Sequence, residues 1–286
     1  MPANGGGHAA APPLAAVGGG RRGAGRWALR GAAFGYLALI LVVPLGMVGW
    51  RAFGDGVGPV LDALDNRFFL HALWLTAIIT LITVVANTIF GVAIAMVLAR
   101  RRGVGGAILS ALVTLPLAVS PVIVGLALVL VWGRQGWFGG ALADQGIQVI
   151  FALPGMVLAS IFISLPFVAR EVAPLLREIG TEQQEAAATL GASPLQTFRR
   201  ITLPAIRWGI AYGVVLTTAR ALGEYGAVAV VSGHLLGRTE TLTLHVEDRF
   251  QAFDIVGAYT AALVLAFLAL LAVVTMHLTR PKESRS

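Results

Sequence analysis

Long apolar runs alternate with short polar segments along most of the chain. Six runs reach roughly the 20 residues that a helix needs to cross the hydrocarbon core of a bilayer while satisfying its own backbone groups. These runs cover residues 32–50, 71–98, 107–132, 150–169, 209–231 and 255–279. The pattern therefore predicts an all-α integral membrane protein with six transmembrane helices.

Proline and glycine recur inside the apolar runs. Four prolines lie within the third and fourth runs, namely Pro116, Pro121, Pro154 and Pro166. In water these residues would argue against helix, whereas in a membrane bundle neighbouring helices satisfy the freed backbone groups. We therefore expect kinked helices at these positions.

If the six apolar runs cross the membrane in turn, their ends lie alternately on its two sides, and cationic residues are distributed unevenly between these sides. Of the 21 Lys and Arg residues, 15 lie at one set of ends, five lie at the other, and Arg220 lies inside the fifth run. Because Lys and Arg resist translocation, the richer side is predicted to be cytoplasmic, together with both termini and the loop at 170–208. The same distribution argues against nucleic acid binding, since the charge marks membrane ends and not one face of a soluble domain.

The composition narrows the chemistry further. Apolar residues make up 57% of the chain and charged residues only 12%. Cysteine is absent, which excludes disulfides, thiolate metal sites and a cysteine nucleophile. The five histidines show no ligand spacing, so we predict no metal site.

The chain ends lie outside the predicted six-span domain, which covers residues 31–279. Residues 1–20 are rich in Gly, Ala and Pro and are predicted to be disordered, and residues 21–30 add a basic flank, so that 1–30 forms a cytoplasmic extension. The apolar run that follows is too long for the core of a signal peptide and is interpreted as an uncleaved first span. Residues 280–286 form a short cytoplasmic tail.

The polar loop at 170–208 carries signals for two short helices. Thr181 and Gln184 match a capping box at the start of the first helix, and Gly191 is expected to end it in a left-handed conformation. Ser193 and Gln196 match a second capping box, and Leu203-Pro204 is expected to end the second helix. Such a pair could insert into a groove on a partner or lie on the membrane surface as an amphipathic connector, and these physical arguments favour neither.

A known motif resembles this loop in identity and spacing. The matching residues are Glu185, Ala186, Ala187, Gly191, Ile201, Leu203 and Pro204. They resemble the EAA loop of bacterial ABC-importer permeases. The resemblance implies a type I importer architecture whose coupling helix inserts into a cleft of a cytosolic ATPase dimer. ATP and Mg²⁺ would be bound by that ATPase, and this chain would carry no cofactor of its own.

A second group of segments resembles the sulfate and thiosulfate permeases, in particular their W-type subunits. The matching segments are 219–228 and 231–234, then Gly237, Thr239, Thr241-Leu242 and 244–247, together with Leu115-Pro116, Val119-Ser120-Pro121 and Gly125. The resemblance covers roughly residues 27–277. The sequence departs from this family at Thr243, where proline is expected. The resemblance implies import of sulfate or thiosulfate across a bacterial inner membrane. It also implies a T-type permease partner and a periplasmic binding protein, with molybdate, tungstate or another small oxyanion as the alternative substrate.

Several polar and small residues are candidates for the pathway or its gate. They are Ser120, Pro121, Arg220, Gly223, Glu224, Ser232, Gly233 and His234. Arg220 and Glu224 are four residues apart, so a helix would place them within pairing distance, either as a structural ion pair, which is the favoured interpretation, or as a gate. Residues 232–234 could offer N–H and O–H donors to an oxyanion, but they are interpreted first as a solvated turn.

An enzyme is a remote alternative. Gly191-Ala192-Ser193 superficially matches the turn of a serine hydrolase, but no His or carboxylate partner is indicated. The chain also lacks a Walker sequence, so it cannot hydrolyse ATP by P-loop chemistry. We therefore predict a subunit that is not itself an enzyme and that needs a partner for energy.

Overall fold

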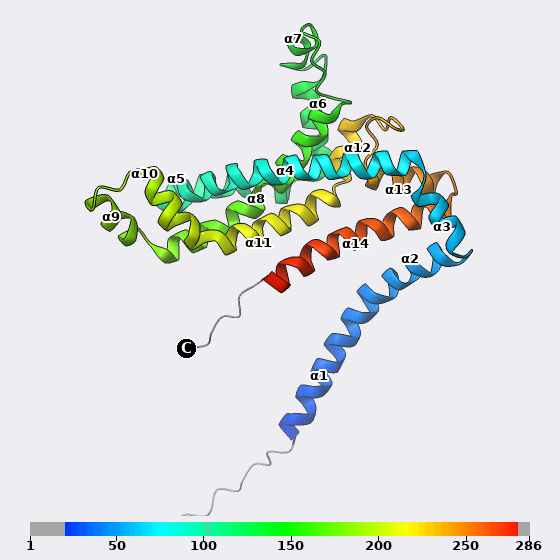
Figure 1. Cartoon of the computed structure of the whole chain (residues 1–286), viewed down its shortest axis with the longest axis horizontal. Helices are drawn as coiled ribbons and strands as arrows, with labels where there is room; N and C mark the ends of the chain where they lie inside the picture. The colour runs from blue at the N-terminus through cyan, green and yellow to red at the C-terminus, as the bar shows by residue number, and fades with distance from the viewer. Residues whose placement is uncertain (1–20, 102, 280–286) are drawn as a thin grey trace, which may run out of the picture. The chain divides into compact units, whose positions relative to one another are not determined.

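The computed structural model describes residues 21–101 and 103–279 (Figure 1). Over these ranges the chain forms helices and no β-strand. The predicted disorder of residues 1–20 and the predicted tail at 280–286 lie outside the described residues. The chain divides into two units, Met1–Met47 and Val48–Ser286, which are considered separately.

The described part of the first unit is one long helical segment. It consists of α1 (Arg21–Leu37), the π-helical turn η1 (Ala38–Val42) and the start of α2 (Val43–Phe53). Residues 21–30, predicted as a flank outside the membrane domain, are thus already helical. The segment Leu29–Phe53 is long and apolar enough to cross a membrane, in agreement with the first predicted span.

The second unit contains the other helices. They are α3 (Val57–Leu64), α4 (Arg67–Arg100), α5 (Val104–Ala118), α6 (Pro121–Trp132), α7 (Gly139–Ala143), α8 (Leu153–Ile179), α9 (Glu182–Thr189), α10 (Pro194–Thr197), η2 (Phe198–Thr202), α11 (Leu203–Leu222), α12 (Gly226–Ser232), α13 (Leu242–Gln251) and α14 (Ile255–Thr279). Figure 1 shows α4, α11 and α14 following roughly one direction, while α6 and α7 project across it.

Five helical segments of the described residues could each span a membrane, and a sixth span requires two helices together. The pair α5 and α6 passes only as a unit, and the two helices are bent by 107°. The run at 107–132, predicted as one span with kinks, is thus interrupted, and its two helices form at most a broken span. Pro121 disfavours helical backbone at the preceding residue, and Ser120 accordingly has an extended ψ of 134°.

The predicted fifth span at 209–231 also differs from the structure. Its helix begins upstream, because Pro194–Leu222 is helical throughout, and α11 ends at Leu222. The break that follows is stabilised by Glu224, whose Oε1 accepts a hydrogen bond of 3.0 Å from the amide of Ala227. A buried carboxylate thus satisfies the start of α12 where helix continuity was expected.

The core of the second unit forms where α8 packs against α4 and α11. Gly91 of α4 and Gly213 of α11 both face Val168 of α8, and a Cβ on either glycine would lie 2.7 Å from an atom of that valine. Such close approach of helices through small residues is typical of membrane bundles. Asn87 adds a polar contact, since its Nδ2 donates to Ser164 Oγ at 2.9 Å.

Two π-helical turns precede proline in the same way. Pro44 and Pro204 are each the second residue of the helix that follows η1 or η2. A proline ring clashes with the carbonyl four residues earlier, and the wider π turn provides the necessary room. In both turns the next amide bonds five residues back, from Val43 to Ala38 and from Leu203 to Phe198.

Candidate functional site

Helix α9 forms the exposed tip of the predicted coupling loop, at one end of the second unit (Figure 1). It begins at Glu182 as predicted, but the predicted capping box of Thr181 and Gln184 is wrong. The Thr181 hydroxyl donates to Glu185 Oε1 at 2.6 Å, and Gln184 Oε1 accepts from Arg100 Nη2 at 3.3 Å. Contacts with a neighbouring side chain and with α4 thus replace the local cap.

The C-terminal end of α9 follows the prediction. Gly191 has a φ of +83°, and its amide and that of Ala192 bond to the carbonyls of Ala188 and Ala187, both at 3.0 Å. This is a Schellman motif, in which a glycine in the left-handed conformation satisfies the last carbonyls of a helix. The motif leaves the Leu190 side chain 88% exposed at the tip.

The second short helix starts as predicted and ends differently. Ser193 and Gln196 form the predicted capping box, with reciprocal hydrogen bonds of 3.3 and 2.9 Å. Leu203-Pro204 was expected to end this helix, which instead continues through η2 into α11. The π turn accommodates Pro204, so the segment that carries Ile201, Leu203 and Pro204 joins the loop directly to a membrane helix.

Arg220 and Glu224 form the ion pair that their spacing predicts. Arg220 Nη1 lies 2.5 Å from Glu224 Oε2, with side chains 31% and 2% exposed. The Glu224 backbone carbonyl also accepts a hydrogen bond of 2.9 Å from the Thr243 hydroxyl. Gly223 lies between the pair in the chain, so this cluster joins the end of α11 to the start of α12.

The two helix breaks lie against each other. A Cβ on Gly226, at the start of α12, would lie 2.9 Å from Pro121 Cβ, at the start of α6. One turn further along α6, a Cβ on Gly125 would lie 2.7 Å from Val230 Cβ. The structure therefore brings Pro121 close to the Glu224 cluster, while Ser120 beside it is exposed.

Polar groups of the turn at 232–234 form contacts within the turn and with Asp248 of α13. The Ser232 hydroxyl accepts a hydrogen bond of 3.2 Å from the amide of His234. Gly233 is left-handed with a φ of +74°, and a Cβ there would lie 2.9 Å from the ring of Phe151. His234 Nδ1 lies 3.9 Å from Asp248 Oδ1. These contacts agree with the interpretation of this segment as a turn.

A buried pair between His245 of α13 and Glu240, two residues before that helix, was not identified from the sequence. His245 Nδ1 lies 2.9 Å from Glu240 Oε1, and the two side chains are 3% and 0% exposed. The ring of Phe69 contacts His245 edge-on at a centroid distance of 6.1 Å. Burial raises the pKa of Asp248 above its ordinary value, and the nearby charge of Glu240 adds a smaller increase. The two residues of the pair are only five apart in the chain, but their burial depends on tertiary packing, including the contact with Phe69 of α4, and the sequence alone does not show it.

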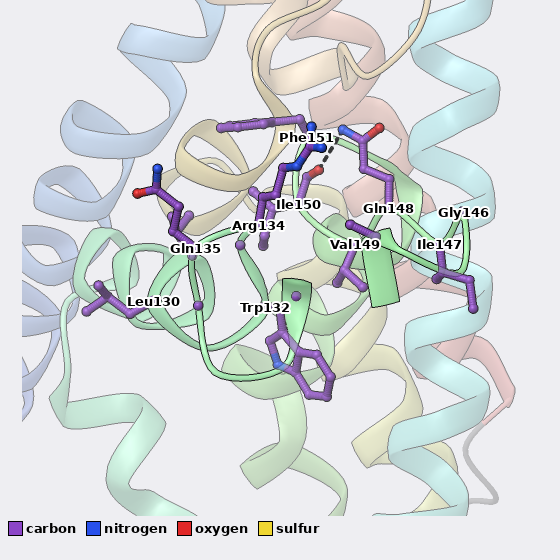
Figure 2. Close-up of a pocket in the computed structure, with 15 residues that line it drawn as sticks. Leu130, Trp132, Arg134, Gln135, Gly146, Ile147, Gln148, Val149, Ile150 and Phe151 are labelled. Atoms are coloured by element: carbon purple, nitrogen blue, oxygen red, sulfur yellow. Dashed lines mark hydrogen bonds between the residues drawn. The ribbon is translucent and has the colours of Figure 1, made fainter. Parts of the chain in front are cut away.

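A cavity of about 810 Å³ lies between the end of α6 and the start of α8. Figure 2 shows the residues that line it. Its polar lining includes Arg134, Gln135 and Gln148, and its lining residues include no carboxylate. Gln148 Nε2 donates to the carbonyl of Ile150 at 3.1 Å, a bond drawn in the figure. This loop lies between two predicted spans and contains no recognised motif, so the sequence predicts no role for it.

Comparison with known proteins identifies similar sequences over most of the chain. The model of a family described as "Binding-protein-dependent transport system inner membrane component" matches residues 88–282. The chain is 49% identical to the "Sulfate transport system permease protein CysW" of a Synechocystis species, over 88% of this chain and 90% of that protein. It is 33% identical to the CysT permease of Salmonella typhimurium, over 87% and 90%.

A solved structure resembles the fold at low sequence identity. It is the crystal structure of a bacterial alginate ABC transporter in complex with an alginate pentasaccharide-bound periplasmic protein. The similarity has a TM-score of 0.76 at 18% identity and covers 91% of this chain and 95% of that chain. At this identity the likeness shows the shared helical architecture alone.

Proposed function

The chain belongs to the family of binding-protein-dependent inner membrane transport components, and from this premise we propose that it is the permease subunit of an ATP-driven importer of sulfate or thiosulfate. The observation that carries the proposal is the 49% identity to a CysW permease over nearly the whole of both chains. The chain is a permease subunit and not itself an enzyme. Energy would come from a cytosolic ABC ATPase dimer that binds ATP and Mg²⁺.

Coupling to this ATPase would pass through α9. Glu185 and Ala186 are exposed on it, and Leu190 and Gly191 are exposed directly after its last residue. An exposed short helix with a small-residue face and an apolar tip suits a groove on a partner. The continuous helix from Pro194 to Leu222 supports this role, because it would carry a movement of the loop into the bilayer.

The remaining partners follow from the proposed importer. The chain would provide half of the translocation pathway, and a T-type permease would provide the other half in a heterodimer. A periplasmic binding protein would deliver the anion on the outer side of a bacterial inner membrane. The distribution of Lys and Arg supports cytoplasmic termini and a cytoplasmic coupling loop.

The Arg220–Glu224 pair is proposed as a latch in the pathway. A carboxylate repels a dianion, so Glu224 is unsuited to bind sulfate directly. Its hydrogen bond to Ala227 and its ion pair with Arg220 couple the end of α11 to the start of α12. Transport would require this connection to change between two arrangements, with Ser120, Pro121 and the 232–234 turn nearby in the pathway.

Competition between substrates tests the proposal. In a bacterial strain that lacks this chain, a plasmid copy should restore uptake of radiolabelled sulfate, and excess thiosulfate should reduce the labelled uptake. Molybdate at the same excess should have little effect. Preferential competition by molybdate would reassign the chain to the alternative, a molybdate or tungstate importer.

A further inference from the structure

A half-open groove of about 780 Å³ lies between the C-terminal ends of α4 and α8 and the helices α9 and α10. Arg100 of α4 and Arg177 of α8 both line it, and we call it the arginine groove. Residues of the coupling loop, including Gln184 and Ala188, also line it, and it shares no residue with the Arg220–Glu224 cluster.

The two guanidinium groups of the arginine groove lack acidic partners. Arg100 donates to Gln184 Oε1 at 3.3 Å and Arg177 donates to the Leu98 carbonyl at 3.2 Å. Over residues 21–101 and 103–279 neither forms an ion pair, and the lining of the groove includes no Asp or Glu. Because a guanidinium carries five N–H donors, both retain donors for an oxyanion.

The lining of the groove also includes apolar side chains, among them Met96 of α4, Leu176 of α8 and Phe198. The groove also lies at the ends of two candidate membrane spans, which finish at Arg100 and Ile179. It would therefore be at the membrane surface, where one ligand can present both an oxyanion and a hydrocarbon chain. A free inorganic anion would use the arginines and leave these apolar side chains uncovered.

We infer that the arginine groove binds an anionic phospholipid. The lipid phosphate lies between Arg100 and Arg177, and part of an acyl chain covers Met96 and Leu176. A lipid in this position contacts α4, α8 and the coupling loop at once. This inference goes beyond the proposed transport function, since lipid binding requires only that the groove lies at a membrane surface.

Native mass spectrometry of the complete transporter in detergent tests the inference, with phosphatidylglycerol and zwitterionic phosphatidylcholine as probes. We expect the wild-type complex to retain phosphatidylglycerol selectively. Combining Arg100→Gln with Arg177→Gln should weaken its binding about tenfold, because each cation at a membrane surface contributes to the attraction of an anionic headgroup. The matched control combines Arg170→Gln with Arg207→Gln, which remove two cytoplasmic-side arginines outside the groove and should leave binding unchanged.

Three outcomes would overturn the inference. Equal retention of the two lipids by the wild-type complex would exclude a headgroup site, and this comparison needs no variant to fold. Displacement of the lipid by millimolar inorganic phosphate would indicate a site for free anions. Retention by the permease pair but not by the complete transporter would indicate that the ATPase covers the groove. Substrate uptake plays no part in this measurement, so each outcome leaves the proposed transport function intact.

Discussion

Glu224 is a carboxylate held almost entirely out of water by its neighbours. Its side chain is 2% exposed and depends on Arg220 for charge compensation. We expect Arg220→Ala to destabilise the protein by about 2 kcal/mol, less than for a fully buried pair because Arg220 is itself partly exposed. The Glu224→Gln change should recover part of this loss in the double variant. Thermal unfolding over the double-mutant cycle measures the coupling, and purely additive effects would contradict it.

Asp248 makes the stability of the region around α13 depend on pH. Burial raises its pKa above the ordinary 3.8, so folding favours the protonated form. The contribution from this group is therefore fully present below pH 3.8 and is lost as the pH rises through the raised pKa. We expect Asp248→Asn to increase the melting temperature at pH 7 relative to wild type, with a smaller difference at pH 4. An equal difference at both values would show that the charge is not responsible.

At the scale of single elements, α9 is the segment whose function is most directly testable. We expect Glu185→Lys and Gly191→Asp, made separately, to abolish copurification of the ATPase and growth on sulfate as sulfur source. Charge reversal alters the exposed face, and an aspartate at a φ of +83° strains the end of the helix.

Glu178→Lys is the control for this prediction, because it makes the same change of charge at the end of α8, outside α9. It should retain both copurification and growth. Retention of the ATPase by the Glu185 and Gly191 variants would exclude the docking role.

The same loop shows which parts of the structure could be read from the sequence. The capping box at Ser193 and the end of α9 at Gly191 were predictable because their contacts lie within a few residues. The capping box at Thr181 does not form, because the Thr181 hydroxyl donates to Glu185 and Gln184 contacts Arg100, 84 residues away. The continuity through Pro204 was missed because a π turn accommodates proline where an α turn would not.

The sequence predicts less of the structure around the candidate pathway residues than of the coupling loop. The pairing of Arg220 with Glu224 followed from their spacing of four residues. The break between α11 and α12 did not, because hydropathy does not distinguish a continuous apolar helix from two short ones. Glu240 and His245 are only five residues apart, but their burial depends on the packing of α13 and produced no periodic signal.

At the scale of the whole second unit, two interrupted helices pack together. Gly125 of α6 allows this contact, since an added Cβ would lie 2.9 Å from the Ala227 carbonyl and 2.7 Å from Val230 Cβ. We expect Gly125→Ala to destabilise the protein by about 1–3 kcal/mol, because backbone cannot move aside as a flexible side chain can. Thermal unfolding measures the loss.

Gly58→Ala is the matched control, since a Cβ at that helical position would meet nothing within 4 Å. It should leave stability unchanged or slightly improved, because alanine is the better helix former. Equal effects of the two substitutions would show that α6 and α12 are not tightly packed.

The π turn at Phe198–Thr202 affects the direction in which the coupling loop projects from α11. A π turn holds about one residue more than an α turn, which shifts the rotational phase of everything before it by about 100°. Pro204 thereby affects the direction in which α10, and α9 before it, project from the helix that continues to Leu222. If residues 198–202 formed a regular α-helix, the coupling loop would rotate by about a quarter of a turn about the axis of α11. An ATPase bound to the loop would then contact a different face of it.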